Sequence, residues 1–207
     1  MTAPAGSSPT LVLLDESHLV EYRELLHAAY AEPERLGVHF AAATADDAQI
    51  ARHLRENLAY GLTVDAITVD ANGAGAASAG ATPAATLVGS ISLRLPWGPN
   101  PGHLGLPHIG WLAAHPTLAP KGTGALLIQA LIDQVLIPQL HAPAVSLGTA
   151  ADHPWLGAYY QRLGFEPVGS ADLGLGHLTN FYLRPLDPPA YAGWRTRHAD
   201  LLEGLTS

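Results

Sequence analysis

The sequence contains no cysteine and only one lysine, Lys121. Without cysteine, the chain can form no disulfide, hold no metal through thiolates and use no cysteine nucleophile. It also lacks a long apolar run, because the most apolar stretch, residues 125–140, is interrupted by Gln129, Asp133 and Gln134 and is too polar to cross a membrane. The first ten residues carry neither a positive charge nor an apolar stretch, unlike a secretory signal. We therefore expect a cytoplasmic protein with no membrane partner.

Charged residues are scarce, at 14 % of the chain, and their balance is acidic. Ten Lys and Arg against eighteen Asp and Glu give a net charge of −8, which argues against nucleic acid as a partner because nucleic acid attracts basic surfaces. With 48 % hydrophobic residues over 207 positions, the chain can bury the core of one domain. Abundant Ala, Gly and Pro beside a single lysine are typical of a high-GC bacterial source.

Hydrophobic spacing predicts a mixture of helices and strands. Apolar residues at intervals of three and four indicate helices over 19–30, ended by Pro33, and over 46–60, 122–140 and 155–163. Short alternating or continuous apolar runs indicate strands at 11–14, 62–69, 86–95, 108–114, 144–147 and 178–183. Strands that follow one another directly, mixed with helices, predict an α/β (α+β) fold around a mixed sheet.

Two segments depart from this pattern. Residues 70–85 are nearly all Ala, Gly and Ser, and we expect a flexible loop because such residues bury too little side chain to offset their ordering entropy. Residues 188–207 place Tyr191, Trp194, His198 and Leu201 at intervals of three and four, which predicts an amphipathic helical tail. The tail packs either on its own domain, residues 1–187, or on a second copy, so the protein is a monomer or a homodimer.

A strand, a glycine-rich turn and an apolar helix follow one another between Trp111 and Leu140. Gly122 and Gly124 precede the helix, so its free N–H groups can approach an anion, and Lys121 adds a positive charge there. The alternative is a structural turn that needs glycine for a positive φ. The Walker A and dinucleotide-binding patterns are both absent, because the lysine precedes the glycines and no third glycine follows Gly124.

Farther along, Tyr160-Gln161-Arg162-Leu163-Gly164-Phe165, taken together with Leu112–Ala125, resembles the GNAT superfamily of N-acetyltransferases. The resemblance implies a mixed sheet of about six to seven strands flanked by helices, and acetyl-CoA as cosubstrate without a metal. Ala119 stands where the family carries Gln or Arg, and Pro120 stands where glycine is common, so the loop depends on backbone N–H groups and Lys121. The implied cofactor contacts are Leu112, Ala113, Ala114, Lys121, Gly122, Thr123, Gly124, Ala125 and His153.

The family's chemistry is direct attack of an amine on the acetyl thioester, which needs a general acid and a general base. The resemblance makes Tyr160 the acid toward the departing sulfur, and the alternative is a core tyrosine. No carboxylate stands in the strand 108–111, where members often carry one. His108 is the substitute that we expect to act as base, and the alternative is a histidine that faces solvent.

The family's acceptor pocket lies between its first two helices, which implies Glu32, His39 and Phe40 as substrate contacts, with Trp97 facing them. Solvated loop residues are the alternative at each position. With a net charge of −8, we expect a cationic amine as acceptor, and the family resemblance makes it a primary amine of a small molecule. A non-catalytic acyl-CoA sensor and a protein or peptide N-acetyltransferase remain alternative functions. No metalloprotease or Gly-x-Ser-x-Gly motif is present.

Overall fold

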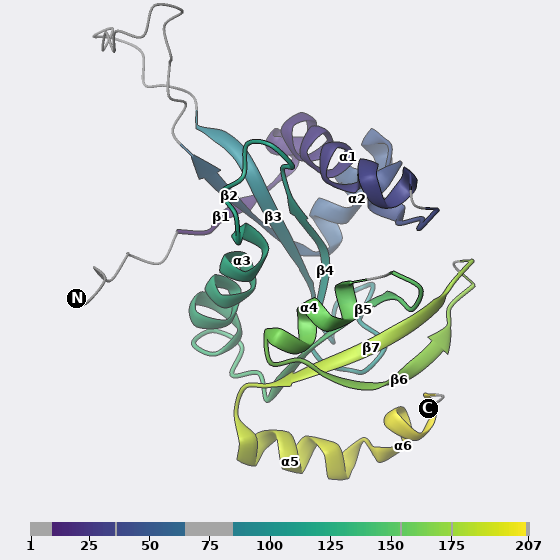
Figure 1. The fold of residues 1–207 in the computed structure, drawn as a ribbon. Helices are drawn as coiled ribbons and strands as arrows, with labels where there is room; N and C mark the ends of the chain where they lie inside the picture. Colours follow the sequence, from purple (N-terminus) through teal and green to yellow (C-terminus); the bar gives the residue numbers. More distant parts are fainter. Residues whose placement is uncertain (1–9, 36, 65–84, 154, 175, 206–207) are drawn as a thin grey trace, which may run out of the picture.

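The computed structural model describes residues 10–35, 37–64, 85–153, 155–174 and 176–205. Within them a seven-stranded mixed sheet runs in the order β1-β2-β3-β4-β5-β7-β6 (Figure 1). All neighbouring strands are antiparallel except β4 and β5. The strands are β1 Val12–Leu14, β2 Leu58–Val64, β3 Thr86–Arg94, β4 His108–Ala114, β5 Ala144–Ala150, β6 Glu166–Asp172 and β7 Leu178–Pro185. The α/β class and the size of the sheet confirm the prediction.

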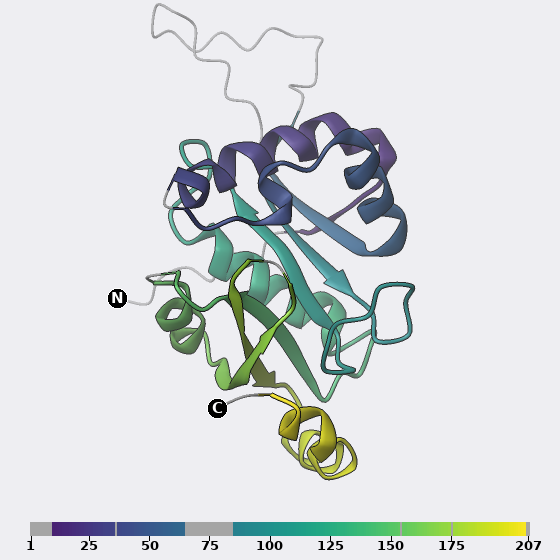
Figure 2. The same ribbon diagram turned by 90° about the vertical axis from the view of Figure 1, so that its right-hand side faces the viewer.

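Helices cover both faces of the sheet (Figures 1 and 2). Two of them, α1 and α2, pack on one face, where Tyr22 and Ile50 are fully buried. Two others, α3 and α4, pack on the opposite face, where Leu127 and Tyr160 meet Val145. The helices are α1 Leu19–Arg35, α2 Asp47–Glu56, α3 Thr123–Leu131, α4 Leu156–Arg162, α5 Pro188–Arg197 and α6 Ala199–Glu203, with short turns η1 Glu16–His18, η2 Ala41–Ala43 and η3 Ile132–Leu136.

The sheet opens between its two central strands. The strands β4 and β5 pair only at His108–Ser146 and Ile109–Leu147, and beyond that point they separate. The register of β3 with β4 shifts at the same level, and Trp111 there has a positive φ of 43°. The bulged Trp111 ring stacks on His53 of α2, with centroids 3.7 Å apart. A bulge bends its strand, so the second half of β4 diverges from β5 and leaves a gap.

Several predicted element ends are wrong. The proline at position 33 does not end α1, which continues to Arg35, because a proline in the last turn removes few backbone bonds. The helix α2 stops at Glu56, since Asn57 is already extended, and β2 therefore begins earlier than predicted. The apolar helix after Gly122 ends as a π-turn at Leu136 rather than at residue 140. The edge strand β6 was not predicted, and the expected loop 70–85 lies almost wholly outside the described residues.

The C-terminal segment forms two helices rather than one. The carbonyl oxygen of Trp194 accepts hydrogen bonds from both the main-chain N–H and Nδ1 of His198, and the chain leaves α5 at that residue. Tyr191, Trp194 and Leu205 are buried against Phe181 and other residues of the chain's own sheet. The segment therefore packs on the domain that precedes it.

Candidate active site

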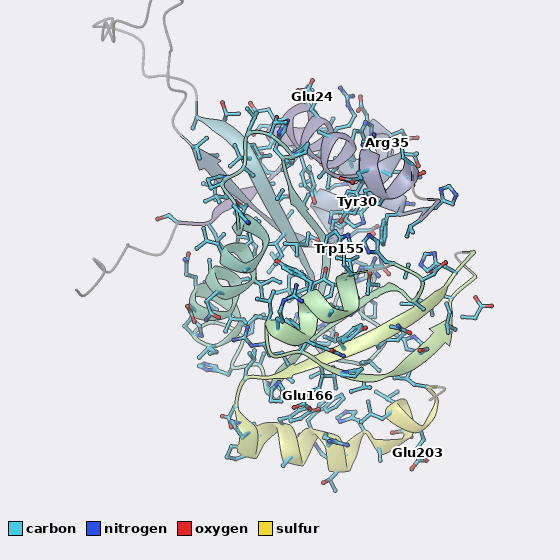
Figure 3. All side chains as sticks on the ribbon, viewed as in Figure 1. Glu24, Tyr30, Arg35, Trp155, Glu166 and Glu203 are labelled. Carbon is cyan, nitrogen blue, oxygen red and sulfur yellow. The ribbon has the colours of Figure 1, made fainter. Side chains whose placement is uncertain are left out.

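A cavity of about 880 Å³ occupies the gap between β4 and β5. Its walls come from both faces of the sheet: Tyr30 and Phe40 from the α1–η2 side, and Thr123 and Tyr160 from the α3–α4 side. Figure 3 labels Tyr30 and Trp155, which line the cavity from α1 and from the start of α4. Because the gap passes through the sheet, ligands that enter from the two faces can meet in it.

Most of the predicted site residues line this cavity. They are Glu32, His39, Phe40, His108, Leu112, Ala113, Ala114, Gly122, Thr123, Gly124, His153 and Tyr160. Lys121 and Ala125 lie beside it, in the turn before α3 and in its first turn, but are not among its lining residues. The structure does not bring Trp97 to the cavity. A turn closed by the Gly98 N–H on the Leu95 carbonyl carries its side chain outward, and 68 % of Trp97 is exposed.

The glycine-rich turn has the geometry of an anion site. Gly122 is the N-cap of α3 with a φ of 92°, a conformation that favours glycine. The first hydrogen bond into the helix is donated by the Leu126 N–H to the Gly122 carbonyl, so the N–H groups of Gly124 and Ala125 have no intrahelical partner. A Cβ at Gly124 would lie 2.7 Å from the Tyr159 hydroxyl. Glycine at 124 thus makes room for the Tyr159 hydroxyl, and the free N–H groups at the start of α3 are the feature that fits the phosphates of an acyl-CoA.

A histidine that the sequence did not single out shapes the same turn. The Nδ1 atom of His115 accepts hydrogen bonds from the backbone N–H groups of Thr117 and Leu118, at 3.3 and 3.1 Å. Its own backbone N–H donates to the carbonyl of Val88 on β3. These bonds tie the turn to the sheet, and they compensate in part for the glycine that Pro120 replaces.

Tyr160 lies on α4 with only 8 % of its surface exposed. Its backbone carbonyl accepts from the N–H groups of Leu163 and Phe165 at the end of the helix, and its ring packs against Phe165 and Tyr182. Burial raises the pKa of the Tyr160 phenol above its ordinary value, and the nearby Tyr30 adds to the effect. The hydroxyl therefore keeps its proton at neutral pH and can donate it to a group in the cavity.

His108 is buried rather than facing solvent. Its Nδ1 lies 2.9 Å from the Ser146 hydroxyl, which itself donates to the Pro107 carbonyl at 3.3 Å. Since Ser146 has only one proton to donate, Nδ1 of His108 is the donor in their pair, and Nε2 is left as the acceptor. Burial, together with the charge of Arg94 and with His103, lowers the pKa of His108 to about 3, so its ring is neutral at pH 7.

The cavity is also lined by polar residues most of which the sequence did not predict. The Arg94 Nε, Thr149 Oγ1, His153 Nδ1 and Thr179 Oγ1 atoms are buried, line the cavity and have no hydrogen-bond partner. Buried polar atoms without a partner are uncommon in folded proteins, and these four belong to residues that all line one cavity. Only His153 was predicted, because the other three stand in strands whose alternation does not distinguish cavity positions from buried ones.

No group of three or more His, Asp or Glu side chains that could hold a metal occurs in the described part of the chain. Among the same residues, no helix is long and apolar enough to cross a membrane.

Comparison with known proteins identifies relatives of this chain, although no family model matches the sequence. An S-(2-succino)cysteine N-acetyltransferase of Bacillus subtilis (strain 168) is 36 % identical over 178 residues, which cover 86 % of this chain and 96 % of that protein. An S-alkylcysteine N-acetyltransferase of the same organism is 26 % identical over 147 residues, covering 70 % of this chain and 72 % of that protein.

Solved structures share the fold. A GCN5-related N-acetyltransferase from Rhodopseudomonas palustris has a TM-score of 0.60 and 18 % identity, covering 89 % of this chain and all of that one. The mixed sheet opens beside a helix that is capped by glycine, and the relatives are N-acetyltransferases. Together these findings define an enzyme that transfers acyl groups to amines. The chain belongs to the GNAT superfamily of N-acetyltransferases. The resemblance of the glycine-rich turn and the Tyr160–Phe165 segment to that superfamily is confirmed.

Proposed function

We propose that this enzyme transfers an acetyl group from acetyl-CoA to the α-amino group of an S-substituted cysteine. The observation that carries the proposal is the relative that acts on S-(2-succino)cysteine, which is 36 % identical over 96 % of its length. The cavity agrees with a small acceptor, since its volume of about 880 Å³ extends over both the α1–η2 side and the α3–α4 side, is of the order found for small-molecule sites, and must hold the acyl arm as well as the acceptor.

The acceptor enters from the α1–η2 side. Glu34 is held in place there by the Nδ1 of His39 at 2.8 Å and by the backbone N–H of Phe40. Phe40 packs near Tyr30 and His153, which gives an aromatic wall on the acceptor side. The predicted acceptor contacts Glu32, His39 and Phe40 therefore suit an amino-acid acceptor, and Trp97 has no part in this arrangement.

The acyl donor binds on the α3–α4 side. When bound, acetyl-CoA supplies a thioester carbonyl that an amine can attack. The open N–H groups of Gly124 and Ala125 would hold its phosphates, with Lys121 adding charge at the rim. The strand residues Leu112–Ala114 line the route toward the gap and would position the acyl arm.

His108 and Tyr160 would divide the proton transfers. Nε2 of His108 accepts a proton from the acceptor's ammonium group, directly or through water. The amine then forms a C–N bond with the acetyl carbon as the C–S bond breaks, and the Tyr160 hydroxyl donates its proton to the departing sulfur. The new amide nitrogen gives up its remaining extra proton, which restores the Tyr160 phenol, and His108 releases its proton to solvent. The products are an N-acetyl amino acid and the thiol of coenzyme A.

Isothermal titration with acetyl-CoA tests the donor site, using wild type, Lys121→Ala and the control Arg52→Ala. Arg52 is exposed on α2 and does not line the cavity. We expect Lys121→Ala to weaken binding by about two- to fivefold, as for an exposed ion pair, and Arg52→Ala to leave it unchanged. No binding to wild type would contradict the proposal.

Release of free coenzyme A tests the acceptor, with S-(2-succino)cysteine, S-methylcysteine, spermidine and a peptide with a free N-terminus. We expect turnover with the cysteine derivatives and little with the others. Acetyl-CoA binding without release on any acceptor would instead favour an acyl-CoA sensor. Release on the peptide alone would favour a protein N-acetyltransferase.

We place the reaction in the cytoplasm of a bacterium and expect a monomer or a homodimer without a nucleic-acid partner. The two Bacillus subtilis relatives support a bacterial source, and the net charge of −8 argues against a nucleic-acid partner. Size-exclusion chromatography with light scattering would settle the oligomeric state.

A further inference from the structure

Arg94, at the end of β3, is the one arginine or lysine among the described residues that line the cavity. Its side chain is half-buried, and its Nε has no hydrogen-bond partner. In the described part of the chain, no carboxylate lies within ion-pair distance of it. By contrast, Arg23 and Arg55, on the surface, pair with Asp47 and Glu16. A guanidinium stays charged at neutral pH, so Arg94 brings to the cavity a positive charge that no ion pair engages, although Glu32 and Glu34 also line the cavity.

The sheet register places this charge on the acceptor side. Arg94 pairs directly with His108 across β3 and β4, so the two side chains emerge on the same face. The His108 ring lies 6.4 Å from that of Phe181, which is buried on the α5 side of the sheet. Tyr160 packs with α3 on the opposite face. Arg94 and the proton donor therefore meet the cavity from different sides.

A second unpartnered donor lies on the same face. The Thr179 Oγ1 is buried without a partner and lines the cavity. Its methyl group would contact a Cβ at Gly148, as would the Phe181 ring, so Thr179 shares the face of Arg94, His108 and Phe181. The acidic residue Glu34, which lines the same cavity, is already engaged by His39 and Phe40. The side of the cavity that would hold the acceptor thus presents the hydrogen-bond donors of Arg94 and Thr179 to a bound anion.

We propose that Arg94 binds a carboxylate of the acceptor and so makes the enzyme selective for carboxylate-bearing amines. This inference rests on the proposed function, because an S-substituted cysteine carries one α-carboxylate and its S-(2-succino) form carries two more. Arginine suits this task since its planar fork matches the two oxygens of a carboxylate. Either the α-carboxylate or a carboxylate of the S-substituent can be the group that Arg94 binds, and the acceptors compared below distinguish the two.

The bound carboxylate also affects the base. Burial is the main cause that lowers the pKa of His108, and the charge of Arg94 adds to it. A carboxylate on Arg94 compensates the second cause alone, so it raises the pKa of His108 in part. An amine without a carboxylate lacks both the contact and this effect.

The test compares kcat/KM for S-(2-succino)cysteine, S-methylcysteine and S-methylcysteine amide in wild type, Arg94→Gln, Arg94→Lys and the control Arg52→Gln. For wild type and Arg52→Gln, we expect kcat/KM to be about 10- to 100-fold higher with an acceptor that has the carboxylate bound by Arg94 than with the acceptor that lacks it. Arg94→Gln should abolish that preference, and Arg94→Lys should retain part of it. Thermal unfolding of each variant checks that it folds.

Two results support the proposal and identify the carboxylate. If Arg94→Gln removes the preference for S-methylcysteine over its amide, Arg94 binds the α-carboxylate. If it removes the preference for S-(2-succino)cysteine over S-methylcysteine, Arg94 binds the substituent. An equal effect of Arg94→Gln on all three acceptors, or no effect on any, overturns the proposal.

Equilibrium titration with N-acetyl-S-methylcysteine and N-acetyl-S-(2-succino)cysteine separates this inference from the proposed function, since binding of a product requires no turnover. If wild type acetylates none of the three acceptors, the proposed function fails. Binding of either product that Arg94→Gln weakens about tenfold or more still supports the carboxylate site. Equal binding to wild type and variant, or no binding to wild type, overturns it.

Discussion

At the scale of single residues, burial holds both Tyr160 and His108 in their neutral forms. Removal from water disfavours the charged form of any group. It therefore raises the pKa of the Tyr160 phenol and lowers that of the His108 imidazole to about 3. Both side chains are neutral at pH 7, but one holds a proton and the other has a vacant Nε2. The shifts themselves weaken both groups, because a phenol with a raised pKa gives up a proton less readily and an imidazole with a lowered pKa accepts one less readily, so the proposed roles rest on the positions of the two side chains in the cavity.

The first prediction concerns the donor. Replacing Tyr160 by Phe should lower kcat by about a hundredfold or more, because it removes the proton for the departing sulfur, while the dissociation constant of acetyl-CoA changes little. Tyr182→Phe is the matched control, since Tyr182 is buried in the same core but does not line the cavity. Steady-state kinetics and titration measure both quantities. Equal kcat values for the two variants would rule out Tyr160 as the acid.

Residues of the site differ in how far local sequence could reveal them. Tyr160 and Gly122 belong to short contiguous patterns, so the sequence could point to them. Arg94 becomes a cavity residue only through its register with His108 on the next strand, and a Pro- and Gly-rich connection separates the two. The unpartnered hydroxyl of Thr179 depends likewise on the place of β7 beside β5. Sheet register is a tertiary property that a single sequence does not display.

At the scale of elements, the turn before α3 determines where the helix N-terminus points. Gly122→Ala should cost about 1 to 2 kcal/mol of folding free energy, because its φ of 92° strains an L-residue. Relief of that strain should move the N–H groups of Gly124 and Ala125 and weaken acetyl-CoA binding by about tenfold. Chemical unfolding and titration calorimetry measure the two effects.

Gly105→Ala is the control for this turn. Gly105 also has a positive φ, 62°, and an added Cβ would meet only Leu201 at an ordinary contact distance. It lies outside the cavity, so its replacement should destabilise the fold without changing acetyl-CoA binding. If both variants bind acetyl-CoA like wild type, the turn is structural only.

Element ends were predicted less well than element types, and the causes are physical. The β6 strand contains Pro167 and Gly169 and lies at the sheet edge, where few of its residues are buried enough to give an apolar pattern. The α2 helix ends because Asn57 turns extended and bonds back to His53, which local propensity does not reveal. Both results depend on neighbours that are distant in sequence or on side-chain bonds.

At the scale of the whole molecule, the split sheet gives one cavity walls from both of its faces. The α3–α4 face presents free N–H groups and the phenol of Tyr160, whereas the α1–η2 face presents Arg94 and His108. The β-bulge at Trp111 that creates the gap is itself held by the ring of His53 on α2. Packing of α2 therefore affects the geometry of the site as well as the stability of the fold.

The last prediction concerns acid stability. Burial, with the charge of Arg94, lowers the pKa of His53 to about 3, as it does for His108. In the unfolded chain each titrates near 6.5. Between about pH 6.5 and pH 3 the unfolded state therefore binds two protons that the folded state does not. This contribution to stability is fully present above pH 6.5 and is lost as the pH falls.

Urea unfolding at pH 7, 6 and 5 measures this loss. Each histidine should lower the free energy of unfolding by up to about 1.4 kcal/mol per pH unit. His53→Phe keeps a ring against Trp111 but binds no proton. The part of the slope of unfolding free energy against pH that His53 and His108 contribute should therefore fall to about half. If His53→Phe has the same pH slope as wild type, His53 is protonated in the folded protein. The stacked pair beneath the bulge would then have to accommodate a charge, and the gap that it supports would be less rigid than the contacts imply.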